Sequence, residues 1–212
     1  MIDSNFIKNT AINISNVSRE TLKELDDYCK QIISKNKDIN LISSSTEKSI
    51  KTRHIIDSAQ TIDFIDNIKI KTCTDLGSGA GLPGIVLAIL MKPINPQFKV
   101  ILYEKSFHKS KFLTDMSKKF NLNTEVYQKN IFEEKNLVTD TLVSRAFKPL
   151  PTILDLVSNN FKKLNSIILF LGKSGKEYLP NCMRAWNFEY KEKKSLTNPE
   201  SKVIKIYNLK KK

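Results

Sequence analysis

The chain of 212 residues contains only 3 cysteines and 2 histidines, and it lacks long apolar runs. Cys29, Cys73 and Cys182 are widely spaced and form no C-x-x-C pair, which argues against a disulfide framework and a structural zinc site. We therefore expect reduced thiols and no metal. The longest apolar run covers residues 85–91, whereas a membrane helix needs about 20 residues. The first residues do not resemble a secretory signal, so we expect a cytoplasmic protein that does not associate with membranes.

Acidic residues are scarce in the second part of the chain. The whole sequence has 35 Lys and Arg against 22 Asp and Glu, a formal net charge of +13. Residues 1–68 hold nine basic and ten acidic residues, whereas residues 69–212 hold 26 basic and 12 acidic ones, a net charge of +14. Such an excess indicates an anionic partner, with RNA as the leading candidate. A lysine-rich genome would produce a similar excess without a functional reason.

Glycine and proline are absent before Gly77, and the apolar residues of this first part recur at helical spacing. Two helical stretches are expected, one over residues 22–33 and one over residues 50–65. Ser18 is a suitable N-cap for the first, with Glu20 in its first turn. We therefore predict an N-terminal helical extension over residues 1–68.

From about residue 70 onward, β-branched apolar runs have the length of strands, and helical segments lie between most of them. The expected strands cover residues 70–76, 98–104, 124–127, 141–144, 166–171 and 203–209, with another near Phe188. This alternation predicts a mostly parallel α/β sheet with right-handed crossovers. The last two strands leave no room for a helix between them, so we expect an antiparallel C-terminal hairpin. Residues 69–212 are thus predicted to form one Rossmann-like domain.

Four of the 6 glycines lie between Gly77 and Gly84, after the first expected strand and before a helix. A backbone without Cβ atoms turns sharply and admits a ligand closely, and the helix N-terminus offers unpaired N–H groups. Gly79, Gly81 and Gly84 spell the dinucleotide fingerprint G-x-G-x-x-G. Glu104 ends the next strand, where a carboxylate can accept both ribose hydroxyls of an adenosine cofactor. This pattern alone does not separate NAD from S-adenosylmethionine.

Two features favour S-adenosylmethionine. Asp75 lies two residues before Gly77, which gives D-x-G-x-G-x-G, and a terminal hairpin stands in place of a second mononucleotide-binding half. Three functions therefore stay open from the residues themselves: a methyltransferase, an NAD-binding oxidoreductase, and a non-catalytic RNA-binding module. No His–Asp or Tyr–Lys constellation typical of an oxidoreductase stands out.

Several ordered stretches resemble the ribosomal RNA small subunit methyltransferase G family (RsmG, also called glucose-inhibited division protein B). Residues 75–85 are similar to the cofactor motif of that family. The other stretches are Asn40 with Leu41, where Ile42 replaces the usual Thr, residues 53–58, Glu104 with Lys105, Lys109, Phe112 and Leu113, residues 144–146, and Lys173. The resemblance runs from about residue 20 to residue 209.

The resemblance implies a class I methyltransferase fold and transfer of a methyl group from S-adenosylmethionine to N7 of a guanine in 16S ribosomal RNA. The partner is then 16S rRNA or the small ribosomal subunit, and we expect a monomeric enzyme. By family position, the cofactor contacts Gly77, Leu82, Asn130, Ile131 and Arg145, although residues 128–131 depart from the family, in which an Arg and a Glu are common. Together with the glycine-rich turn and the acidic positions, the expected cofactor-binding set is Asp75, Gly77, Gly79, Gly81, Leu82, Glu104, Asn130, Ile131 and Arg145.

The candidates for RNA contact are Arg53, His54, Lys148 and Lys173. For His54 a structural role is the alternative, because Arg53 and Asp57 are four residues apart and can pair across one helical turn. No catalytic residue is expected to act as a general base, since N7 of a neutral guanine carries a lone pair and no proton.

Overall fold

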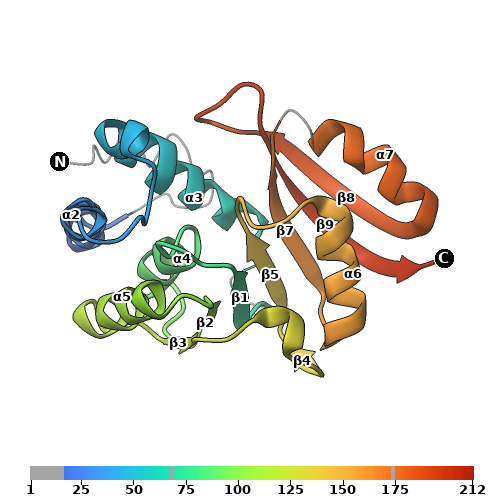
Figure 1. The fold of residues 1–212 in the computed structure, drawn as a ribbon, viewed down its shortest axis with the longest axis horizontal. Helices are drawn as coiled ribbons and strands as arrows, with labels where there is room; N and C mark the ends of the chain where they lie inside the picture. Colours follow the sequence, from blue (N-terminus) through green and yellow to red (C-terminus); the bar gives the residue numbers. More distant parts are fainter. Residues whose placement is uncertain (1–16, 67–68, 173–174) are drawn as a thin grey trace.

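The computed structural model describes residues 17–66, 69–172 and 175–212, and its centre is a seven-stranded sheet of order β3-β2-β1-β5-β7-β9-β8 (Figure 1). The strands are β1 (Thr72–Leu76), β2 (Lys99–Tyr103), β3 (Thr124–Tyr127), β5 (Thr141–Ser144), β7 (Ser166–Leu171), β8 (Trp186–Lys194) and β9 (Lys202–Lys211). Strands β1, β2, β3, β5 and β7 are parallel, whereas β9 runs antiparallel to β7 and β8 antiparallel to β9. The predicted mostly parallel sheet with its terminal antiparallel hairpin is confirmed.

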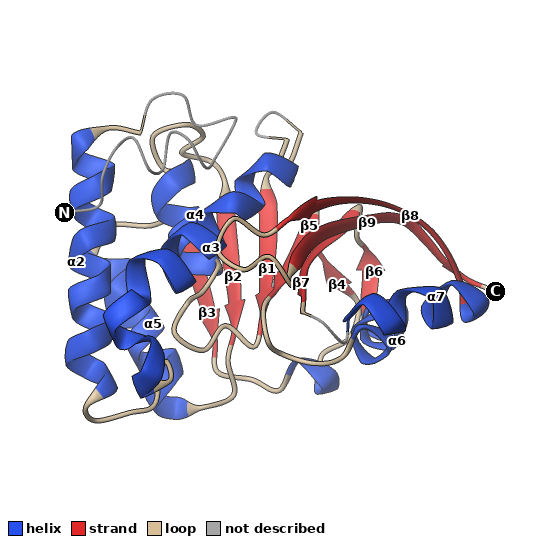
Figure 2. Ribbon diagram, turned by 90° about the horizontal axis from the view of Figure 1, so that it is seen from above, coloured by secondary structure: helices blue, strands red, loops and turns tan. Residues whose placement is uncertain are grey.

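Helices lie beside both halves of this sheet (Figures 1 and 2). They are α2 (Arg19–Asn36), α4 (Gly84–Met91), α5 (Phe107–Lys119), α6 (Leu150–Asn160) and α7 (Gly175–Ala185). Ser18 caps α2 as predicted, because its hydroxyl accepts the Thr21 N–H at 3.2 Å. Two features were not predicted: α7, whose Pro180 is atypical of a helix interior, and a small second sheet of β4 (Leu137–Val138) and β6 (Phe161–Lys163).

The helix expected over residues 50–65 is a chain of short turns instead. Its elements are the π-helix η2 (Lys51–Ile56), α3 (Asp57–Ala59) and η3 (Gln60–Phe64), and the 3-10 helix η1 (Ser44–Ser49) precedes them. Single π-turns are frequent at functional sites, and this one leaves the Arg53 carbonyl bonded to a side chain, Arg145, at 3.1 Å. The irregular path therefore reflects a tertiary contact that local helical spacing does not reveal.

Successive residues of the inner strands are buried on opposite faces of the sheet. Val143 and Ile168 pack in one apolar cluster with Tyr28 of α2, whereas Leu142 and Ile167 pack in another with α6. The helices before β1 thus share a core with the sheet. The predicted boundary at residue 68 lies outside the described residues, so the division into 1–68 and 69–212 stays a prediction. Within the described ranges, no helix has the length and apolar character needed to cross a membrane.

Candidate active site

A cavity of about 520 Å³ opens beyond the carboxyl ends of β1, β2, β3 and β5, the edge where ligands bind in open α/β sheets. The predicted cofactor residues that line it are Gly77, Gly79, Leu82, Glu104, Asn130, Ile131 and Arg145, joined by the predicted RNA residues His54 and Lys148. Asp75, Gly81 and Arg53 do not line it. Lys173 lies outside the described residues. The structure therefore brings most of the predicted site together in one place.

The glycine-rich turn keeps its shape through contacts with α2. Gly81 adopts a positive φ of 80°, and a Cβ there would overlap the Ile85 side chain and lie 2.6 Å from the Tyr28 hydroxyl. That hydroxyl, fully buried, donates a hydrogen bond to the Ala80 carbonyl. This role of Tyr28 was not predictable from the sequence, because a place on the apolar face of a helix carries no signal for a hydrogen bond to a distant turn.

Asp75 supports the turn from behind. Its side chain is 1% exposed, and its Oδ2 accepts the Gly84 N–H at 2.9 Å. Burial raises the pKa of this carboxyl to about 7, while the hydrogen bond from Gly84 opposes the rise. Asp75 therefore shapes the start of α4 and stands behind the cavity wall, not at its surface.

Glu104 supports the turn from the cavity side. Its Oε2 accepts the Gly79 N–H at 2.9 Å and its Oε1 accepts the Ser106 N–H at 2.8 Å. Each carboxylate oxygen has a further lone pair, so the side chain can hold the backbone and still accept hydroxyl hydrogens from a ligand. A Cβ at Gly79 would meet nothing closer than the Gly77 carbonyl oxygen at 3.8 Å, which leaves the cavity beside Glu104 open.

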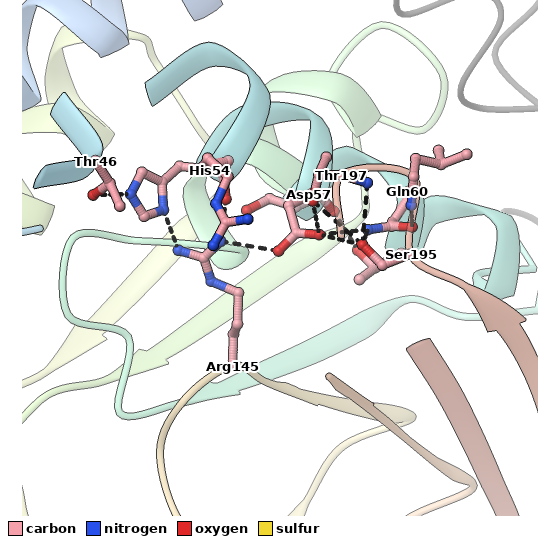
Figure 3. Close-up of polar contacts among 11 residues, drawn as sticks. Thr46, His54, Asp57, Gln60, Arg145, Ser195 and Thr197 are labelled. Atoms are coloured by element: carbon pink, nitrogen blue, oxygen red, sulfur yellow. Dashed lines mark hydrogen bonds and ion pairs between the residues drawn. The ribbon is translucent and has the colours of Figure 1, made fainter. Parts of the chain in front are cut away.

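Arg145 follows β5 and forms the opposite wall (Figure 3). Its Nη1 donates to Asp57 Oδ2 at 3.3 Å and its Nη2 donates to His54 Nδ1 at 2.6 Å. Burial lowers the pKa of the guanidinium, and the Asp57 carboxylate opposes that shift. The pair that helical spacing allows between Arg53 and Asp57 does not form: Asp57 pairs with Arg145, and the Arg53 backbone carbonyl also accepts a hydrogen bond from Arg145.

His54 is held as a neutral acceptor. Because Nδ1 receives the Arg145 hydrogen bond, Nε2 carries the proton and donates to the Thr46 hydroxyl at 2.8 Å (Figure 3). Burial, and then the charge of Arg145, lower the His54 pKa to about 4. Both ring nitrogens are thus occupied, which fits a structural role and leaves no free base at this wall.

Aromatic and basic side chains at the cavity were missing from the predicted site. Phe132 and Phe147 stack with ring centroids 6.0 Å apart, and both line the cavity. Ala146 has a positive φ of 53°, which turns the chain so that Phe147 covers Gly77. The lining also includes Lys105, Lys109 and Lys129, which, with Lys148, give it a cationic border. In the sequence, the aromatic and basic lining of the cavity is indicated only by the alternation of Lys with Phe in residues 105–109 and 129–132.

Comparison with known sequences gives consistent matches over most of the chain. A family model described as rRNA small subunit methyltransferase G matches residues 21–206. The ribosomal RNA small subunit methyltransferase G of Pelagibacter ubique (strain HTCC1062) is 47% identical over 199 residues, 93% of each chain. The protein of that name from Rickettsia akari (strain Hartford) is 36% identical over 196 residues, 91% of this chain and 97% of the relative.

Solved structures share the fold at low sequence identity. The 16S rRNA methylase RmtB superimposes with a TM-score of 0.56 at 12% identity, over 92% of this chain and 76% of that one. The MTase domain of METTL16 gives a TM-score of 0.52 at 14% identity, over 72% of this chain and 65% of that one. The architecture is therefore that of methyltransferases.

Proposed function

The chain belongs to the rRNA small subunit methyltransferase G family, and from this premise we propose that it methylates N7 of a guanine in 16S ribosomal RNA with S-adenosylmethionine as donor. The observation that carries the proposal is that Glu104, the turn around Gly79 and Arg145 line one cavity at the carboxyl edge of the sheet. The substrate is 16S rRNA or the small ribosomal subunit. We expect a monomer that works in the cytoplasm.

The residues of the cavity fit S-adenosylmethionine. Glu104 keeps free lone pairs for the two ribose hydroxyls, and Gly79 lets a ligand approach the backbone. Asn130 and Ile131 line the region beyond β3, where an adenine would lie against the chain. Arg145 retains N–H groups beyond those bonded to Asp57 and His54, and these suit a carboxylate.

The main task of the protein in this reaction is to orient the two reactants, because the reaction requires no proton transfer by a side chain. When bound, S-adenosylmethionine supplies an electrophilic methyl group on a sulfonium. N7 of guanine needs no deprotonation, so the neutral and fully bonded His54 is consistent with a site without a general base. What the walls of the cavity supply is alignment of the base with the donor, which is catalysis by proximity and orientation.

The cationic border of the cavity fits an RNA strand. Among the described residues, Lys105, Lys109 and Lys148 have no acidic partner, whereas Lys129 pairs with Glu134 at 3.1 Å. Unpaired lysines bind phosphates with a strong salt dependence, and Phe132 and Phe147 offer faces on which a base stacks. Lys148→Glu should weaken RNA binding about tenfold at low salt and reduce the salt slope by about 1–2, with unchanged cofactor affinity. Lys162→Glu, away from the cavity, is the control.

The decisive experiment is methyl transfer to small subunits from cells that lack the modification, followed by mapping of the modified base. A methyl group on guanine N7 of 16S rRNA supports the proposal, and its absence from the rRNA contradicts it. Thermal shift with S-adenosylmethionine, S-adenosylhomocysteine and NAD tests the oxidoreductase alternative, because a ligand of the native state raises its stability. A non-catalytic RNA-binding module would bind RNA without any transfer.

A further inference from the structure

One carboxylate joins three segments that are far apart in the sequence (Figure 3). Asp57 Oδ2 accepts Arg145 Nη1 from the end of β5 at 3.3 Å. Its Oδ1 accepts Gln60 Nε2 at 2.7 Å, Thr197 Oγ1 at 2.8 Å and Ser195 Oγ at 3.1 Å. Ser195 and Thr197 belong to the loop between β8 and β9, so the antiparallel end of the sheet reaches the wall of the cavity through Asp57.

The loop is held to Asp57 by a closed set of bonds. Gln60 Oε1 accepts the Leu196 N–H at 3.2 Å, and the Ser195 hydroxyl accepts the Thr197 N–H at 3.2 Å. Each member of the set therefore fixes another, and the carboxylate has little freedom to turn. A network with satisfied donors and acceptors of this kind specifies one geometry.

Arg145 depends on this geometry because its guanidinium is largely enclosed, with 16% of the side chain exposed. An enclosed charge is costly without a compensating partner, and Asp57 is the only acidic side chain within ion-pair distance of it among the described residues. The Arg53 carbonyl accepts from Nη1, the nitrogen that also bonds Asp57, and His54 accepts from Nη2, but both of these contacts are neutral. Without Asp57, the cation would be free to turn into the cavity, where positive charge passes to the guanine during methylation.

We propose that Asp57 is a positioning residue for methyl transfer, which holds Arg145 against the cavity wall and is itself held by Ser195 and Thr197 of the β8–β9 loop. The inference rests on the function proposed above. It makes a loop remote from the glycine-rich turn part of the site. In this arrangement Arg145 contacts the ligand, and Asp57 fixes the position of the Arg145 guanidinium.

The chain contains a matched control for a purely structural role. Asp63, six residues later, forms an ion pair with Lys193 of β8. That pair connects the same helical segment to the same hairpin as Asp57 does, but it does not contact Arg145 and does not line the cavity. Asp63→Asn therefore weakens only the connection between the helical segment and the β8–β9 hairpin. Asp57→Asn weakens that connection and also removes the ion pair with Arg145.

The test is a double-mutant cycle on the full chain with Asp57→Asn and Arg145→Ala. Binding is measured with S-adenosylhomocysteine by calorimetry, and single-turnover methylation is measured on small subunits that lack the modification. We expect Asp57→Asn to weaken S-adenosylhomocysteine binding at least fivefold and to slow transfer at least tenfold. In the Arg145→Ala background it should change neither, and Asp57→Glu should recover part of both. Asp63→Asn should leave both near the wild-type values.

Equal losses from Asp57→Asn in the two backgrounds would overturn the proposal, as would an Asp63→Asn variant that is impaired as strongly. If Asp57→Asn does not fold, the double variant Ser195→Ala with Thr197→Ala keeps both charges. It should slow transfer about two- to fivefold with Arg145 present and leave the rate unchanged without it; a loss in both backgrounds again contradicts the inference. A wild-type enzyme that methylates no rRNA would remove the proposed function instead, while the S-adenosylhomocysteine cycle still reads the coupling of Asp57 with Arg145.

Discussion

The two walls of the cavity are built in different ways. The glycine wall, formed by residues 75–84 with Glu104, is held by carboxylates that accept backbone N–H groups. The arginine wall, formed by His54, Asp57 and Arg145, is held by side chains that bond to one another. Hydrogen bonds to the backbone fix the conformation of the main chain. A substitution that breaks them in the glycine wall should therefore lower both the free energy of unfolding and the ligand affinity. Hydrogen bonds between side chains orient one charged group, the guanidinium of Arg145. A substitution in the arginine wall should therefore reduce function with less change in the free energy of unfolding.

The strongest test of the glycine wall is Gly81→Ala. The positive φ of 80° strains any side chain, and the Cβ would overlap Ile85 next to the buried Tyr28 hydroxyl. We expect a loss of about 2–4 kcal/mol in the free energy of unfolding, together with loss of S-adenosylmethionine binding. Gly172→Ala is the control, because nothing lies within 4 Å of its Cβ position, and it should stay within about 0.5 kcal/mol. Denaturant unfolding and calorimetry measure both; a stable Gly81→Ala protein that fails only in binding would break the comparison.

Asp75 gives the glycine wall a pH dependence of known sign. Its pKa in the folded chain is raised to about 7 by burial, above the ordinary value of 3.8. Its contribution to stability is therefore fully present below about pH 4 and is lost as the pH rises through 7. Between pH 5.5 and 8.5 this amounts to about 2 kcal/mol, which Asp75→Asn should remove.

The control for Asp75 is Asp140→Asn. The pKa of Asp140 is lowered, because the N–H groups of Lys71 and Thr72 outweigh the effect of burial. Its contribution is thus present above its unfolded pKa and is lost in acid, the opposite sign. Urea unfolding at about pH 5.5 and 8.5 measures the free energy of unfolding of the wild type, Asp75→Asn and Asp140→Asn. A wild-type slope that persists in Asp75→Asn would assign the titration to another group.

Glu104→Gln tests whether the glycine wall also binds ligand. An amide presents one N–H₂ group to a backbone N–H of Gly79 or Ser106, so one of two charge-assisted bonds becomes a donor facing a donor. We expect S-adenosylmethionine to bind at least tenfold more weakly, while the fold stays intact. Glu125→Gln, on β3 and away from the cavity, should bind normally. Unchanged affinity in Glu104→Gln would remove the assignment of the adenosine pocket.

The same contrast explains what could be predicted from the sequence. The turn of the glycine wall is encoded within 11 consecutive residues, 75–85, so spacing alone indicated the turn, the strand before it and the helix after it. The resemblance to the methyltransferase family rested on the same kind of contiguous motif, and the family is confirmed. Glu104 was predictable because the end of the next parallel strand lies beside the turn.

The arginine wall could be predicted only in part. Arg145 was expected to contact the cofactor, but its partners lie in residues 53–57, and the β8–β9 loop contacts one of these partners, Asp57. Helical spacing favoured Arg53 as the partner of Asp57, and a tertiary contact prevailed over the local one. Lys148 was expected, whereas Phe132 and Phe147 were not, since a half-exposed aromatic residue has no sequence signature that separates it from the core.

The smallest expected effect concerns the pH dependence of the chemical step. The His54 pKa, lowered to about 4, keeps the imidazole neutral from pH 6 to 9, and its Nδ1 is already occupied by Arg145. Guanine N7 has no proton to lose, so single-turnover rates at saturating cofactor and rRNA should form a plateau over that range. His54→Ala removes one support of Arg145 and should lower the plateau several-fold without giving it a slope. A rate that rises log-linearly with pH in the wild type and becomes flat in one variant would reveal an essential base. The target would then have to be an atom that loses a proton, and the orientation-only account of this site would have to be given up.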